Sequence, residues 1–452
     1  MKIPEANHPP QPARHREATD QFLLSKTDTL PQPSSVSHRQ LSVAAEVLSA
    51  FPELRSGSAF LTHALEHLDG VENFGALVVR MDPRPADEKS ATKADSVARQ
   101  LHIAKVIDHA CRSNAGVWGQ VNLDLFGCFL PSLDLSAIHD LAQKIQQDFK
   151  KKADATVSIG LSAYPLLDYS KRQALDNAHK ALRHAAFFGP GTCTAFDAVS
   201  LNISGDEKYQ NGDVEGAVQE FEMGLRLDPN NVNLHNSLGV CFGVLNQHEK
   251  AWAAFDAAAQ LDSCEVMALY NAGLIRFLQN RHAEALEQFL KAAELDENLY
   301  ELALQTGTLY LAMQKPQKGL PYLKKATRLH PSSGRPFAYL GRCYNALHMK
   351  DLAIAAFKKA IRQNPFDAES LSALGLLYGE KGENPDIATL FCQKSIDISP
   401  DNGMFRSHLG RLHLQYGRLQ EALGAFEEAS ERGWDATADI EKIRVQLTEK
   451  AS

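Results

Sequence analysis

A period of 34 residues runs through the second half of the chain. Six glycines follow one another at that interval and a seventh comes 35 residues later: Gly205, Gly239, Gly273, Gly307, Gly341, Gly375 and Gly410. Most of these glycines are followed at fixed offsets by an alanine and then an aromatic residue, as in Ala251 and Phe255. Small residues let two helices cross closely, and an aromatic ring fills the space beside the crossing. The period therefore predicts helix pairs that bury their apolar faces by stacking on neighbouring pairs.

At these positions the chain resembles the tetratricopeptide repeat family, and four prolines stand at the turns that close repeats: Pro229, Pro331, Pro365 and Pro400. The resemblance implies an all-α solenoid of seven repeats over residues 198–436. The polar segment 437–452, which follows Trp434, predicts a helix that caps the stack.

In this family the first helix of each pair lines a concave face that binds a protein or peptide. On that basis we expect partner contacts from Asn236, Tyr270, Leu274, Phe277, Thr308, Leu311, Arg335, Arg342 and Arg411. The apolar members favour an amphipathic or extended peptide whose acidic residues meet the arginines. The alternative is that some of the apolar members pack inside the solenoid.

Residues 39–197 alternate between strand and helix patterns. Strands are predicted over 74–81 and 155–165, with a hairpin whose arms are 116–121 and 125–131; helices are predicted over 92–112, 135–151 and 170–188. The order βαββαβ predicts an α+β fold, with one antiparallel sheet backed by helices.

This order and its hairpin resemble the GGDEF family of diguanylate cyclases, whose palm-like fold is a ferredoxin-like sheet with helices. The family motif falls on residues 122–126, which read NLDLF. The family reaction joins two GTP molecules, so it needs metal ions held by carboxylates. Asp124 retains one carboxylate, Leu125 replaces the second, and Arg80 stands where the family has a metal-binding aspartate, two residues before Asp82.

Two basic positions of the family are also lost, since they fall on Ala186 and Pro190, and the bulky Leu123 replaces a glycine of the motif. We therefore expect a degenerate GGDEF-like domain that is not an enzyme, with no catalytic residue, no bound metal and no cofactor. Nucleotide binding remains an alternative, through Arg80, Asp95 and Asp124, because an arginine can hold a phosphate where a metal once did.

The remaining features favour a cytoplasmic protein of bacterial type. Residues 1–38 are rich in proline and polar residues and predict a disordered tail. The net charge of -8 gives no reason to expect nucleic acid, and no segment is apolar enough for membrane insertion. The seven cysteines follow no disulfide or zinc pattern. His63, Glu66 and His67 match the short HxxEH zinc motif, but a helix face that serves packing and solvent explains these residues better.

The sequence thus predicts a signalling adaptor or scaffold that binds a partner protein through its repeats. The competing hypothesis is a receptor for GTP or cyclic di-GMP. An active diguanylate cyclase is a third possibility, which would require substitutes for the missing ligands.

Overall fold

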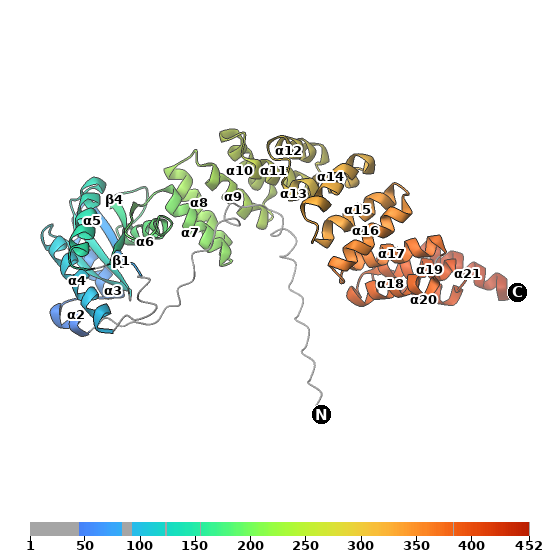
Figure 1. Cartoon of the computed structure of the whole chain (residues 1–452), viewed down its shortest axis with the longest axis horizontal. Helices are drawn as coiled ribbons and strands as arrows, with labels where there is room; N and C mark the ends of the chain where they lie inside the picture. Colours follow the sequence, from blue (N-terminus) through green and yellow to red (C-terminus); the bar gives the residue numbers. More distant parts are fainter. Residues whose placement is uncertain (1–44, 84–92, 123, 154, 383, 452) are drawn as a thin grey trace, which may run out of the picture. The chain divides into compact units, whose positions relative to one another are not determined.

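The computed structural model of the chain describes residues 45–83, 93–122, 124–153, 155–382 and 384–451 (Figure 1). These residues fall into two compact units, and the boundary lies between Ser263 and Cys264. The disordered tail predicted over residues 1–38 lies outside the described residues. Every helix within the described ranges is too short or too polar to cross a lipid bilayer.

The first unit begins with a layer of strands and helices. Its strands are β1 (Phe74–Met81), β2 (Val117–Asn122), β3 (Leu125–Pro131), β4 (Val157–Tyr164) and β5 (Cys193–Ala195). Its helices are α2 (Ala45–Ala50), α3 (Gly57–His67), α4 (Lys93–Arg112), α5 (Leu135–Lys150) and α6 (Gln173–Ala186). The predicted order βαββαβ is confirmed, and β1 has the predicted bounds.

The sheet has the strand order β2-β3-β1-β4-β5. The neighbours from β2 to β4 pair antiparallel, as predicted, and β2 and β3 form the expected hairpin. The prediction of a purely antiparallel sheet is wrong, because β5 pairs parallel with β4. Three residues give too short a pattern to recognise a strand in the sequence. The described region is therefore an α+β layer with a mixed sheet.

Helices cover both faces of the sheet. On one face, α4 and α5 bury Ile107 and Ile145 against Val79 and its neighbours. On the other face, α3 and α6 bury Phe60 and Leu182. A Cβ at Gly160 on β4 would lie 2.0 Å from the carbonyl oxygen of Ala178, so a glycine is required for α6 to approach this closely.

Four more helices complete the first unit as two pairs: α7 (Ala198–Gln210) with α8 (Val214–Leu227), and α9 (Val232–Val244) with α10 (His248–Leu261). Helix α7 packs against α6, the last helix of the α+β region. The first pair is therefore continuous with the sheet-containing part of the unit.

The second unit contains five further pairs among its described residues. The first helices of these pairs are α11 (Val266–Leu278), α13 (Tyr300–Ala312), α15 (Gly334–Ala346), α17 (Ala368–Lys381) and α19 (Gly403–Gln415). Their partners are α12 (His282–Leu295), α14 (Pro316–Leu329), α16 (Lys350–Gln363), α18 (Pro385–Ile398) and α20 (Leu419–Glu431). Helix α21 (Thr437–Ala451) packs on α20 by burying Ile443.

The periodic glycines lie where the two helices of a pair cross. A Cβ at Gly273 would lie 2.6 Å from the ring of Phe289, and a Cβ at Gly239 would lie 2.6 Å from the ring of Phe255. Both rings are fully buried. The small and aromatic positions of the 34-residue period therefore contact each other across the helix pair, as predicted.

Candidate functional site

The predicted partner-binding residues differ in their solvent exposure. Tyr270 and Leu274 are buried in α11, and Asn236 is buried in α9 of the first unit. Phe277, Thr308 and Leu311 are half-buried, whereas Arg335, Arg342 and Arg411 are exposed. Tyr270 and Leu274 therefore pack inside the solenoid, which is the alternative considered above. The arginines are the members of the set that are exposed to solvent.

An aromatic residue that was not singled out in the sequence lies between two of these arginines. The guanidinium carbon of Arg342 lies 5.2 Å from the centroid of the Tyr339 ring, and that of Arg335 lies 5.9 Å from it. Cation-π contacts of this kind restrain a guanidinium without consuming its hydrogen-bond donors. Arg342 also pairs with Glu369 at 3.7 Å, and both side chains are more than half exposed.

Tyr270 of α11 lies within electrostatic reach of Arg335. Burial raises the pKa of the Tyr270 hydroxyl, the charge of Glu301 raises it further, and Arg335 lowers it. The Tyr270 ring stacks on Phe289 with 5.8 Å between centroids. Tyr270 is therefore an uncharged packing residue. The positive charge near it belongs to the exposed side chain of Arg335.

A half-buried histidine lies near the third arginine. The Ser372 hydroxyl lies 2.7 Å from Nδ1 of His408 and can donate to it. Burial lowers the pKa of His408 to about 4, and the charge of Arg411 acts in the same direction. His408 is therefore neutral near pH 7, and Arg411 contributes the positive charge on α19.

In the α+β region, two predicted nucleotide-binding residues lie around His179 of α6. Burial lowers the pKa of His179 to about 4; the charges of Arg183 and Arg80 lower it, and Asp124 raises it. Arg80 and Asp124 therefore act on one imidazole at the hairpin end of the sheet. Asp95, the third predicted residue, lies exposed in the first turn of α4.

Asp82, which follows Arg80 by two residues, is only 4% exposed. Its carboxylate accepts hydrogen bonds from the hydroxyl of Thr156 at 2.7 Å, the hydroxyl of Ser158 at 2.6 Å and the backbone N–H of Gly191 at 2.7 Å. These three donors tie the end of β1 to β4 and to the turn before β5. The Asp82 carboxylate is thus engaged in holding the sheet together.

The other positions considered in the sequence contribute no site in the part of the chain that the structure describes. Ala186 and Pro190 are both exposed at the end of α6 and beyond it. Leu123 lies outside the described residues. In the HxxEH segment of α3, Nε2 of His67 lies 2.9 Å from the carbonyl oxygen of Ala115. No group of metal-ligating side chains occurs among the described residues.

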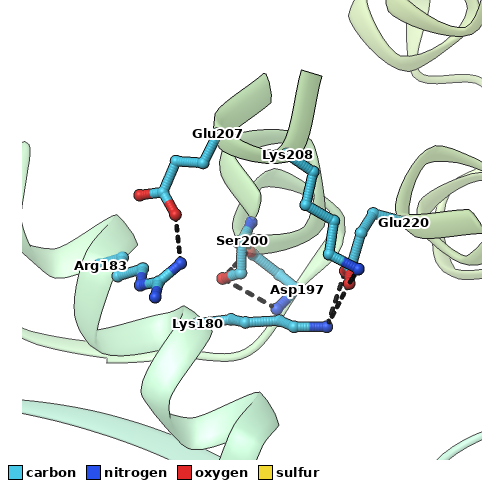
Figure 2. A network of polar contacts seen from close by, with 7 residues as sticks. All are labelled: Lys180, Arg183, Asp197, Ser200, Glu207, Lys208 and Glu220. Carbon is cyan, nitrogen blue, oxygen red and sulfur yellow. Dashed lines mark hydrogen bonds and ion pairs between the residues drawn. The ribbon is translucent and has the colours of Figure 1, made fainter. Parts of the chain in front are cut away.

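The structure also contains a polar network that the sequence analysis missed. Glu220 of α8 accepts from the ammonium groups of Lys180 on α6 and Lys208 on α7, and Arg183 pairs with Glu207 (Figure 2). A signal for it exists in the sequence. Glu220 is the only charged residue at its place in the period; the others are Ala254, Gln288, Tyr322, Ala356, Phe391 and Ala425.

The structure therefore consists of stacked helix pairs that follow an α+β region. Family models for the TPR repeat match residues 205–243, and models for the tetratricopeptide repeat match residues 268–299 and 304–368. The chain therefore contains tetratricopeptide repeats. This repeat class supports a protein-binding role.

Several solved structures are similar to parts of the chain. YrrB, described as a TPR protein with an unusual peptide-binding site, is 25% identical over 44% of this chain and 97% of its own, with a TM-score of 0.37. MamA is 28% identical over 35% of this chain and 93% of its own, with a TM-score of 0.33. A tetratricopeptide repeat protein from Parabacteroides merdae is 17% identical over 54% and 96% of the two chains, with a TM-score of 0.43. No curated protein sequence matches the chain.

Proposed function

We propose that the chain is a non-catalytic adaptor or scaffold that binds a partner protein through the first helices of its repeats. The observation that carries this proposal is the cluster on α15 in which the exposed Arg335 and Arg342 lie against the half-buried ring of Tyr339. Arginines that are held by an aromatic ring lose less side-chain entropy when they bind a carboxylate. The cluster therefore suits an acidic residue of a bound peptide.

The ion pair between Arg342 and Glu369 does not prevent such binding. An exposed pair contributes between about 0 and 1 kcal/mol, so a partner carboxylate with better geometry can replace Glu369. Leu311 and Thr308 on α13, in the same unit, are half-buried and form a surface that is less polar than the arginine cluster. An acidic peptide with apolar residues between its carboxylates fits both features.

Charge reversal at Arg342 tests the proposal. Peptides selected from a random display library on the full chain should be acidic, and Arg342→Glu should weaken their binding about tenfold or more. Lys442→Glu, on the exposed face of α21, is the matched control and should leave binding within about twofold. Equal binding to both variants would show that the first-helix surface is not the site.

We further propose that residues 39–197 form a degenerate GGDEF-like domain, ahead of seven repeats over 198–436 and a cap over 437–452. The α+β layer and its hairpin support this assignment.

The use of Asp82 in hydrogen bonds within the sheet and the presence of Arg80 in place of an acid argue against a bound metal. Cyclic di-GMP formed from GTP and Mg²⁺ by the purified chain would contradict the loss of catalysis. The unpatterned cysteines favour a cytoplasmic location.

A nucleotide receptor is the second candidate, and one observation favours it. The Nε of Arg80 is buried and has no hydrogen-bond partner among the described residues. A phosphate at the hairpin end could accept from it. GTP or cyclic di-GMP at about 100 times its dissociation constant should then stabilise the full chain by about 2.7 kcal/mol. Arg80→Gln should abolish the resulting rise in melting temperature, and no rise with either ligand would exclude this role.

A further inference from the structure

Positive charge is concentrated in one part of the second unit. Residues 302–366 contain eleven lysines and arginines and a single acidic residue, Asp351, which is a net charge of +10. Since the whole chain carries -8, the remaining residues carry -18. A segment of opposite sign on an acidic protein is a local feature that the total charge conceals.

The excess comes from the second helices of two successive pairs. Helices α14 and α16 carry Lys-Lys-x-x-Arg at the same place in the 34-residue period, as Lys324, Lys325, Arg328, Lys358, Lys359 and Arg362. We call these six residues the basic strip. The last pair carries glutamates at the three equivalent positions, Glu427, Glu428 and Glu431. The repeat architecture itself therefore does not require basic residues there.

One lysine of each helix in the strip reaches the first helix of the following pair. Lys324 Nζ lies 5.9 Å from the ring centroid of Tyr344 on α15, and Lys358 Nζ lies 5.3 Å from that of Tyr378 on α17. Each lysine contacts the tyrosine twenty residues further along the chain. Helix α15 packs against both α14 and α16. The lysines thus extend over the first helix of the next pair.

Solvent reaches most of the strip. Five of its members are exposed, and only Lys325 is half-buried. Lys325 pairs with Glu297 at 3.3 Å, and within the described part of the chain the other five have no ion pair. Unneutralised cations gathered at this density repel one another, so a negatively charged partner would stabilise them.

We propose that the basic strip is a second docking surface, and that it binds an acidic segment of a partner protein. Helix α16 also presents apolar surface for such a partner: Leu352 is 49% exposed and lies two turns from Lys359, hence on the same helix face. Apolar contacts surrounded by charged residues are typical of protein interfaces. On α15, Tyr344 lies nearly opposite Arg335 and Arg342 by helical spacing, so this surface is separate from the first-helix cluster.

Two observations favour a protein over other polyanions. Lysines cover the rings of Tyr344 and Tyr378, so these aromatic faces are not free to stack on the bases of a single-stranded nucleic acid. A long nucleic acid or an anionic bilayer would also extend past the strip to residues 264–301 and 367–452 of the same unit, which together carry a net charge of -10 and repel it. A short acidic segment can bind to the strip alone, without extending to the acidic residues beyond it.

The test titrates the full chain into a labelled peptide of Glu-Glu-Ala-Ala repeats and follows fluorescence anisotropy at low and at physiological ionic strength. The variant Lys358→Gln, Lys359→Gln, Arg362→Gln should weaken binding about tenfold or more. Lys291 and Lys394 occupy equivalent places in the pairs on either side, so Lys291→Gln with Lys394→Gln is the matched control. The control should change the dissociation constant less than about twofold.

Two parallel titrations give the outcomes that overturn the proposal. Oligouridylate and vesicles containing phosphatidylserine serve as the nucleic-acid and membrane probes. Tighter binding to either probe than to the peptide would overturn the proposal, as would an equal loss of peptide binding in the control. Arg342→Glu should weaken binding of this peptide much less than the triple variant does, which separates a failure of this proposal from a failure of the first-helix surface.

Discussion

Lys180 on α6 and Glu220 on α8 form an ion pair with 2.7 Å between Nζ and Oε2. Lys208 on α7 lies 3.0 Å from the other carboxylate oxygen. The Glu220 side chain is only 9% exposed, so both ammonium groups neutralise a carboxylate that water scarcely reaches (Figure 2). The α+β region and the first helix pair are therefore held together by charge as well as by packing.

Replacing Glu220 by glutamine should destabilise the first unit. The amide keeps the shape of the side chain but leaves Lys180 and Lys208 without a negative partner, at a cost of about 1–3 kcal/mol. The measurement is urea unfolding of the full chain followed by circular dichroism. Glu222→Gln, at an exposed place on the same helix, should cost less than about 0.5 kcal/mol. Equal midpoints for the two variants would mean that the network contributes no stability.

Substitution of the crossing glycine in α11 tests the packing inside a pair. In Gly273→Ala the new Cβ meets the Phe289 ring at 2.6 Å, so the helices must separate, at a cost of about 1–3 kcal/mol. Gly424 in α20 has open space where its Cβ would lie, so Gly424→Ala should gain up to about 1 kcal/mol from helix propensity. Thermal unfolding should therefore show shifts of opposite sign. A lower melting temperature for both variants would refute this account of the period.

The two aspartates near the hairpin end should differ sharply in their effect on stability. Asp82→Asn removes a charged acceptor from three donors and turns amide hydrogens towards Thr156, Ser158 or Gly191, which should cost about 2–4 kcal/mol. Asp124→Asn changes an exposed side chain and should cost less than about 0.5 kcal/mol. Chemical denaturation of both variants decides whether Asp82 is structural. A cost for Asp82→Asn as small as that of Asp124→Asn would contradict this role.

Features encoded by short-range spacing could be predicted from the sequence. Gly273 and Phe289 belong to one helix pair, so a fixed offset places them in contact. Strand β1 reads as a continuous apolar run because both its faces are buried under helices, and its bounds were predicted correctly. These elements depend on neighbours within a few tens of residues.

Features that join distant segments could not be predicted in this way. Asp82 meets Gly191 across 109 positions of the chain, and nothing local in the sequence distinguishes it from a metal ligand. Strand β5 is defined by its parallel register with β4 and not by its own three residues. The sequence predicts Tyr270 on the concave face that binds a partner, yet its burial depends on side chains such as Phe289 that pack around it. The basic strip was recognisable in the sequence, but only when charge is counted repeat by repeat.

The stability of the second unit should fall as the solution is acidified, because of His408. Its folded pKa is about 4, below the usual 6.5, since burial disfavours the imidazolium. Above about pH 6.5 the ring is neutral in both states and contributes nothing; below it, only the unfolded chain binds the proton until the pH reaches about 4. Stability is therefore lost in this window, by at most about 1.4 kcal/mol per pH unit.

A variant separates this effect from general acid denaturation. His408→Asn keeps an acceptor for the Ser372 hydroxyl but cannot be protonated, so the drop in melting temperature between pH 7 and pH 5 should become smaller. His348→Asn changes an exposed ring at the turn between α15 and α16 and should leave the drop unchanged. An identical drop in the wild-type chain and in His408→Asn would mean that the proton binds elsewhere. In that case His179 of the first unit, whose half-buried ring also has a pKa of about 4, is the next residue to substitute.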